Sequence, residues 1–127
     1  MKYSELARQY FEAPACAGVL VGPGCFRGAA GSRAQGTWVQ FDVQVGSRDG
    51  AGRVQAARFL AFGCPHVIAA SELIAEEAAG RAVEGGLPRS VQSLRERLEV
   101  PIEKLGRLLV VEDAWLAVMR AAARGAH

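Results

Sequence analysis

The sequence predicts an α+β fold, in which a small antiparallel sheet from the first half of the chain is covered on one face by helices. Polar and apolar residues alternate over 37–45, which is typical of a strand with one buried face. A second strand-like segment follows a glycine-containing turn, as in a hairpin. Beyond residue 64 the apolar residues recur at helical spacing, so the helices come after the sheet.

The composition fits one globular domain over residues 1–127 and argues against several classes of function. Half of the 127 residues are apolar, which is enough to bury a core. The net charge of +2 and the 7% aromatic content give no surface suited to nucleic acid. No apolar run is long enough to span a membrane, and residues 1–14 carry acids and lack the apolar centre of a signal peptide. We therefore expect a cytoplasmic protein.

The first predicted elements are a short helix and a glycine-rich connection. Ser4 is a suitable N-cap residue, and Pro14 closes the helix because proline cannot continue it. Residues 15–24 are small and contain three glycines, which predicts a loop. Residues 25–34 are expected to form either a strand weakened by glycine or a further loop.

The strongest strand in the chain is predicted over 37–45. Residues 47–52 supply the turn chemistry of a hairpin, and a second, antiparallel strand is expected over 53–62. The predicted core face of the first strand consists of Val39, Phe41, Val43 and Val45, and its mostly polar face of Trp38, Gln40, Asp42 and Gln44.

Three helices are predicted in the second half of the chain. The first begins at Pro65, runs to about residue 79 and stops at Gly80. Ser90 caps the second, which Pro101 breaks, and the last runs from about residue 103 or 110 to residue 124. The predicted core stripe of the last helix comprises Leu108, Val111, Trp115, Val118 and Met119.

Cys64 is the main candidate for chemistry, because it lies where a strand gives way to a helix. The positive end of a helix dipole lowers the pKa of a thiol and makes the thiolate available as a nucleophile or a metal ligand. The alternative is a small buried residue without chemistry. Cys16 and Cys25 show no metal-binding spacing, so we expect inert, reduced thiols.

The other titratable residues near this seam are expected to be solvated. His66 follows Cys64 by two residues, but side chains at that spacing diverge by about 200° on a helix, so a solvated or capping histidine is expected. Glu72, Glu76 and Glu77 are expected to form a solvated helix face rather than an acid–base pair or an iron site.

Several segments occur in an order and spacing that resemble one known family. They are Phe59-x-x-Phe62-Gly63-Cys64 followed by Ile68-Ala69-Ala70-Ser71, then Val100-Pro101, then Glu112-Asp113-Ala114. This pattern resembles the iron–sulfur cluster assembly scaffolds of the IscU/NifU type over nearly the whole chain. The resemblance implies a three-stranded antiparallel sheet packed with helices, and a scaffold rather than an enzyme. It also implies an iron–sulfur cluster as cargo, and a cysteine desulfurase and a heat-shock-type chaperone as partners.

The same resemblance assigns the cluster site to three cysteines and an aspartate, and most of these positions are substituted here. Cys64 is the only family ligand that is retained. Gln35 and Thr37 stand at the positions of the first cysteine and the aspartate, and Gly106 and Arg107 replace the His-Cys pair. Arginine donates hydrogen bonds and cannot ligate iron, and one thiolate cannot hold a cluster within a monomer. The resemblance therefore implies a degenerate site.

Three functions remain open from the sequence. The first is a diverged scaffold in which Cys64 accepts sulfur, helped by Arg107, or in which the chain binds assembly partners. The second is an interaction module without chemistry, which uses the segment 100–104. The third is a small-molecule binder in which Arg107 contacts an anion. A site relocated to Cys16 and Cys25, or one formed by Cys64 of two chains in a homodimer, is a further alternative.

Overall fold

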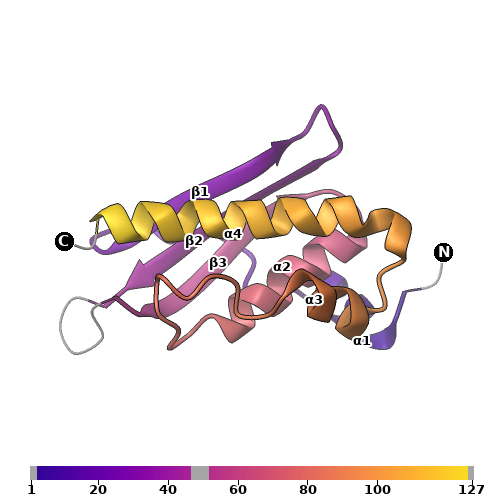
Figure 1. The fold of residues 1–127 in the computed structure, drawn as a ribbon, viewed down its shortest axis with the longest axis horizontal. Helices are drawn as coiled ribbons and strands as arrows, with labels where there is room; N and C mark the ends of the chain where they lie inside the picture. The colour runs from indigo at the N-terminus through magenta and orange to yellow at the C-terminus, as the bar shows by residue number, and fades with distance from the viewer. Residues whose placement is uncertain (1–2, 47–51, 126–127) are drawn as a thin grey trace.

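The computed structural model describes residues 3–46 and 52–125 and contains a helical layer on one face of a sheet (Figure 1). The predicted α+β class is therefore confirmed. Residues 47–51, which carry most of the predicted hairpin turn, lie outside the described part of the chain. The elements in chain order are α1 (Glu5–Glu12), β1 (Cys25–Ser32), β2 (Thr37–Val45), β3 (Val54–Phe62), α2 (Pro65–Glu77), α3 (Val91–Leu98), the 3₁₀ helix η1 (Ile102–Lys104) and α4 (Leu105–Gly125).

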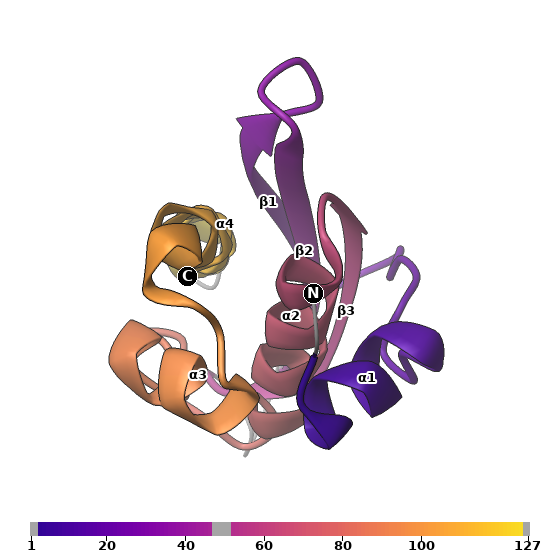
Figure 2. The same cartoon turned by 90° about the vertical axis from the view of Figure 1, so that its right-hand side faces the viewer.

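The sheet has three antiparallel strands in the order β1-β2-β3. Val39, Phe41 and Val43 of β2 are fully buried, as the alternating pattern predicts. Helix α4 packs on β1 and β2, and α2 packs on β3. Figure 2 shows that α1 and α3 lie farther from the sheet, and that the β1–β2 hairpin extends beyond the helices.

Strand β1 and helix α4 approach each other closely at glycine residues. A Cβ atom added to Gly28 would overlap the backbone of Val118 in α4, and one added to Gly125 would overlap the ring of Phe26. Glycine weakens a strand in isolation, which left a strand and a loop equally open for residues 25–34. Packing against α4 therefore decides in favour of the strand.

The predicted core stripe of α4 is confirmed, since its five residues are all buried. The ring of Trp115 packs edge-on against Phe41 with 5.1 Å between centroids. Its indole nitrogen donates a hydrogen bond of 3.0 Å to the carbonyl of Gly86. A buried tryptophan thus keeps its polar atom satisfied while it joins α4 to the sheet.

The predicted helix caps are confirmed, but one helix ends earlier than expected. The hydroxyls of Ser4 and Ser90 accept hydrogen bonds of 3.1 Å from the backbone N–H groups of Ala7 and Ser93. Helix α3 ends at Leu98 rather than at Pro101, because Glu99 adopts a left-handed conformation with φ of 54°.

The outer face of the sheet is less solvated than the alternating pattern suggests. Asp42 is buried there and accepts two hydrogen bonds from Arg27, at 2.8 and 2.9 Å, and one of 2.9 Å from the N–H of Leu20. The segment 15–24 is a loop, as predicted, but it also forms a parallel bridge between Ala17 and Phe59. This segment therefore covers part of the outer face and the edge of β3.

Candidate functional site

Cys64 occupies the turn between β3 and α2 and is the N-cap residue of α2. The strand ends at Phe62, and Pro65 takes the first helical position, where its missing N–H costs nothing. The carbonyl of Cys64 accepts a hydrogen bond of 2.9 Å from the N–H of Val67, which begins the helical pattern. The thiol thus lies at the positive end of a 13-residue helix.

The surroundings of Cys64 favour its thiolate. Partial burial raises the pKa of the thiol. A hydrogen bond from Arg107, the N–H groups of Val67 and His66, and the charge of Arg107 lower the pKa, and together they outweigh the effect of burial. The net result is a pKa below the ordinary value for cysteine. Cys64 therefore carries more thiolate at neutral pH than an unperturbed thiol, and it is only half-buried.

Arg107 reaches Cys64 from the first turn of α4, a segment far away in the sequence. The residue is exposed apart from this contact, and so is its neighbour Gly106. A Cβ atom on Gly106 would meet no atom within 4 Å, so no contact requires glycine there. The structure thus brings Cys64 and Arg107 together and leaves open space at Gly106.

Gln35 and Thr37 lie at the turn between β1 and β2. Gln35 is exposed, and its N–H donates a hydrogen bond of 3.1 Å to the hydroxyl of Ser32. Thr37 begins β2 and is buried. The carbonyl of Gly36 lies 3.5 Å from the position of a Cβ on Gly63. The turn therefore contacts the residue before Cys64, although no hydrogen bond of the described residues joins Gln35 or Thr37 to the thiol.

Cys25 is not placed near Cys64. It pairs with Gln44 at one end of β2, whereas Phe62 pairs with Trp38 at the other. Six residues of strand separate those two positions, or about 20 Å. A cluster site relocated to Cys25 and Cys64 within one chain is therefore not supported.

Cys16 is held against α2 and is a weak acid. Burial, together with the charge and a hydrogen bond of Glu72, raises the pKa of its thiol to about 11. All three cysteines are free thiols. Cys16 thus remains protonated at neutral pH, and of Cys16 and Cys64 only the latter is activated.

The expectation of a solvated or capping His66 is wrong. The side chain is fully buried, and its ring packs edge-on against Tyr3 with 4.7 Å between centroids. Burial and the positive charges of Lys104 and Arg107 lower the pKa of His66 to about 4. His66 is therefore neutral at physiological pH. The sequence could not show this, because Tyr3 is distant from His66 along the chain.

The expectation that Glu72 belongs to a solvated face is also wrong. Glu72 is fully buried, and its Oε1 accepts a hydrogen bond of 2.8 Å from the N–H of Cys16. Glu77 pairs with Arg89 at 2.6 Å. The hydrogen bond from Arg89 holds the pKa of Glu77 below its usual value. Glu72 and Glu77 thus have structural partners in neighbouring segments, whereas Glu76 is exposed, as expected.

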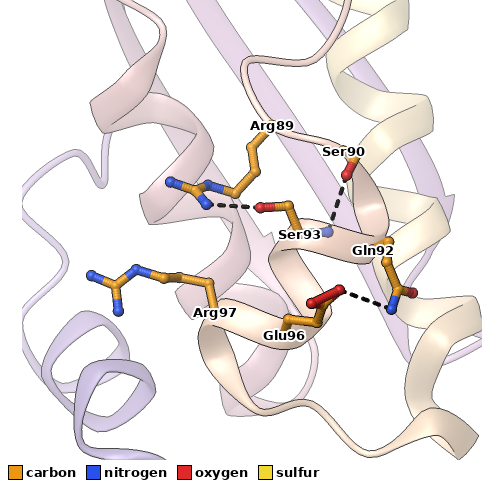
Figure 3. A pocket seen from close by; sticks show the side chains of 6 residues that line it. All are labelled: Arg89, Ser90, Gln92, Ser93, Glu96 and Arg97. Carbon is orange, nitrogen blue, oxygen red and sulfur yellow. Dashed lines mark hydrogen bonds between the residues drawn. The ribbon is translucent and has the colours of Figure 1, made fainter.

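A cavity of about 390 Å³ lies beside α3, and none of its residues was a predicted site residue (Figure 3). Arg89 lines it but donates to Glu77 at 3.0 and 2.6 Å and to Ser93 at 2.7 Å. The charge of Arg89 is therefore already paired with Glu77. The residues that line the cavity are Arg89, Ser90, Gln92, Ser93, Glu96 and Arg97.

The residues around Cys64 do not fit an iron–sulfur cluster within one chain. Over residues 3–46 and 52–125, no group of three or more histidine, cysteine, aspartate or glutamate side chains is placed to hold a metal ion. A guanidinium contacts the single thiol, and it can donate but not ligate. The arrangement is suited to stabilising an anion on sulfur.

Comparison with known proteins places this chain in a family. The model of the NifU-like N-terminal domain matches residues 2–122. The chain belongs to this family. The resemblance inferred from the sequence motifs is thereby confirmed, and so is the three-stranded sheet that it implied.

The relatives of this NifU-like domain include named scaffold proteins. The iron–sulfur cluster assembly scaffold protein IscU of Haemophilus influenzae is 31% identical over 125 residues, with 94% of each chain covered. IscU of Azotobacter vinelandii is 29% identical, covering 94% of this chain and 93% of its own. The bifunctional protein NifU/MnmA of Rubrobacter xylanophilus is 35% identical over 101 residues, which cover 80% of this chain and 20% of that protein.

Solved structures show the same fold. The N-terminal part of a NifU-like protein from Brucella abortus superposes with a TM-score of 0.71 at 16% identity, covering 95% of this chain and 94% of that chain. A putative scaffold protein for the SUF system from Fervidobacterium islandicum gives 0.55 at 13% identity, covering 96% and 94%. In the described part of this NifU-like domain, no helix has the length and apolar character needed to cross a membrane.

Proposed function

We propose that this NifU-like domain is a diverged, cytoplasmic member of the scaffold family, which accepts sulfur on Cys64 and does not hold a cluster on ligands of its own. The observation that carries the proposal is the contact between Cys64 and Arg107. The guanidinium lowers the pKa of the thiol. The family resemblance puts Arg107 at a position that a family ligand would take. The role is that of an acceptor or carrier rather than an enzyme.

The proposed step transfers one sulfur atom without net oxidation. The Cys64 thiolate attacks the outer sulfur of a donor cysteine persulfide, and a new S–S bond forms to Cys64. The donor's S–S bond breaks, and the donor cysteine leaves as a thiolate. Arg107 and the N–H groups at the start of α2 stabilise the negative charge on Cys64 before attack and on its persulfide afterwards.

The partners are proposed from the family resemblance. A cysteine desulfurase would supply the persulfide, and a heat-shock-type chaperone would recognise the segment 100–104. In this segment Ile102 is 61% exposed, whereas Val100 and Lys104 are buried. Lys104 lies 5.8 Å above the ring of Tyr3. Ile102 and Glu103 are therefore the residues of this segment that a partner would contact first.

Mass spectrometry of the intact protein tests the proposal. A variant that keeps only Cys64, with Cys16→Ser and Cys25→Ser, is treated anaerobically with glutathione persulfide. We expect a mass gain of one sulfur atom, which disappears on Cys64→Ser and slows several-fold on Arg107→Gln. No gain on the Cys64-only protein would contradict sulfur acceptance and favour an interaction module.

Anaerobic reconstitution with iron and sulfide tests the second half of the proposal. We expect the wild-type protein to remain colourless and free of iron. A stable visible absorbance with bound iron, lost on Cys64→Ser, would show that the chain still holds a cluster. Such a cluster would have to lie between two chains or use ligands outside the described residues.

A further inference from the structure

Strand β1 forms an open edge of the sheet. Among the described residues it pairs with β2 on one side, and no strand lies on its other side (Figure 1). The opposite edge is partly covered, because the backbone of Phe59 in β3 makes hydrogen bonds of 3.0 and 2.8 Å to Cys16 and Gly18. The two edges of the sheet are therefore not equivalent, and the edge at β1 is the one without a neighbouring segment.

The register shows which backbone groups of β1 face outward. The N–H of Val45 donates a hydrogen bond of 2.8 Å to the carbonyl of Gly24, just before β1 begins. Bonded and non-bonded pairs alternate in an antiparallel ladder, so the even-numbered residues of β1 bond to β2. Arg27, Ala29 and Gly31 then direct their N–H and C=O groups away from the sheet. Outside the strand ladders, no hydrogen bond of the described residues uses these groups.

This edge lacks the features that usually prevent strands from pairing. Proteins protect edge strands with proline, with bulges or with lysine side chains that lie across the edge. Strand β1 contains no proline and no lysine, and Arg27 is its only charged residue. The guanidinium of Arg27 donates to Asp42 of β2 at 2.8 and 2.9 Å, so it lies over the sheet and away from the open edge. The backbone of β1 is therefore accessible to another strand.

Helix α4 provides an apolar strip beside the same edge. A Cβ atom on Gly31 would lie 2.9 Å from the side chain of Val110, and one on Gly28 would contact the backbone of Ala117. Val110, Ala117 and Ala121 lie on one face of the helix by their spacing, and all three are half-buried. A strand added next to β1 would cover these side chains.

We propose that β1 pairs with β1 of a second copy of this chain, so that the two sheets join into one continuous sheet. An antiparallel pairing centred on Ala29 puts this residue opposite Ala29 of the second copy and puts Arg27 opposite Gly31. Each of these pairs can exchange two backbone hydrogen bonds. Glycine leaves room for the arginine side chain, and no two arginines face each other. The sequence of β1 is thus complementary to itself about this residue.

The charges on α4 favour a second copy over an unrelated strand. Each residue of the apolar strip is followed three positions later by an exposed charged residue, namely Asp113, Arg120 and Arg124. Residues three apart are neighbours on a helix, so these charges border the strip. The two-fold axis makes the two α4 helices run antiparallel on the same face of the joined sheet. The acidic first half of each helix then lies on the side of the basic second half of the other.

This pairing is independent of sulfur transfer. Cys64 follows β3, which is the strand at the other edge of the sheet. Joining two copies through β1 therefore leaves both thiols uncovered. The dimer would form equally if Cys64 accepted no sulfur.

Sedimentation equilibrium tests the proposal on the wild-type protein between about 1 and 300 µM, because a dimer forms by mass action. We expect the mass to rise reversibly from 13.5 kDa towards twice that value. A reducing agent is present, since all three cysteines are free thiols and a disulfide would also give a dimer. Cys64→Ser should dimerise like the wild type. A wild-type protein that stays monomeric over the whole range would overturn the proposal.

A charge exchange at Ala29 tests the register. This residue is exposed, so Ala29→Lys and Ala29→Glu are compatible with the fold, which circular dichroism checks. Each variant alone puts two like charges opposite each other and should weaken the dimer several-fold. An equimolar mixture of the two should restore it as a heterodimer. The control Gln55→Lys changes an exposed residue of β3 and should dimerise like the wild type. No weakening by either variant, or no recovery in the mixture, would overturn the proposal.

Hydrogen–deuterium exchange of the wild type, resolved by residue, covers the case in which a variant does not fold. We expect the amides of Arg27, Ala29 and Gly31 to exchange several-fold more slowly at high protein concentration than at low concentration. Ala61 is the matched control, because the alternation that turns Phe59 outward also turns the N–H of Ala61 outward, on the other edge. Equal exchange of the β1 amides at both concentrations would exclude pairing through this strand.

Discussion

Cys64 and Arg107 form a contact between two helix starts that are remote in sequence. Each residue alone has an ordinary explanation: a small N-cap residue and an exposed arginine. Together they place a guanidinium and backbone N–H groups around one sulfur. At the scale of single residues, this contact lowers the pKa of the thiol, which is why we propose Cys64 as a sulfur acceptor.

Removing the Arg107 charge should make the Cys64 thiol a weaker acid. In the Cys64-only background, Arg107→Gln is expected to raise the thiol pKa towards its ordinary value. Alkylation by iodoacetamide at about pH 7 should then slow by about three- to tenfold, because only the thiolate reacts. Arg120→Gln, at an exposed position of the same helix, is the control. An unchanged midpoint of the pH–rate curve would show that Arg107 does not act on the thiol.

His66 should make the protein less stable in acid. Its folded pKa of about 4 lies below that of an unfolded histidine, so the unfolded state binds more protons. The stabilisation is complete above about pH 6.5 and is lost as the pH falls towards 4. His66→Phe keeps an aromatic ring beside Tyr3 and removes the titration. Relative to this variant, the wild type should lose about 2 kcal/mol of unfolding free energy between pH 7 and pH 5. Equal losses would contradict a neutral buried histidine.

At the scale of elements, the approach of β1 to α4 organises the fold. The strand contains glycine where the helix backbone comes closest, and the helix presents its buried stripe to the sheet. On the neighbouring strand β2, Phe41 packs against Trp115 of α4, a contact that β-propensity or helix propensity alone does not specify.

Two glycine substitutions should have opposite effects. Gly28→Ala puts a methyl group against the backbone of Val118, which cannot move without shifting α4, and should cost about 1–3 kcal/mol of stability. Gly106→Ala enters open space in the first turn of α4 and should be neutral or stabilising by up to about 1 kcal/mol. Urea titrations of both variants provide the comparison. A tolerated Gly28→Ala would mean that β1 and α4 do not pack this closely.

At the scale of the whole molecule, residues 1–127 were predicted to form one domain, and this remains a prediction. Helix α4 packs on the sheet and on α2. Helix α3 packs on both α2 and α4, and helix α1 packs on α2. Elements that share contacts in this way are expected to unfold together.

Unfolding should therefore follow a single transition. Trp38 lies on the outer face of the sheet and Trp115 in the core, so tryptophan fluorescence reports on both. We expect the fluorescence curve to coincide with that of far-ultraviolet circular dichroism in a urea titration. Two separated midpoints would show that part of the chain unfolds independently.

Much of this organisation could be predicted from local patterns. The alternation of polar and apolar residues over 37–45 predicted β2 and its buried face. The N-cap residues Ser4 and Ser90 predicted where α1 and α3 begin. Residues 25–34 could be predicted only as a strand or a loop, because glycine weakens a strand until a partner packs on it. His66 and Glu72 were misjudged because their burial depends on Tyr3 and Cys16, which are distant in sequence.

The sequence by itself indicated the family, predicted most of the secondary structure and singled out Cys64 as the candidate for chemistry, because these follow from periodicity, capping and motif spacing. Only the tertiary structure decided that Arg107 contacts Cys64, that Cys25 lies at the far end of the sheet, and that Glu72 is buried beside Cys16. The physical reason is that a pKa and a buried charge depend on neighbours in space. Such neighbours come from segments whose approach no local pattern records.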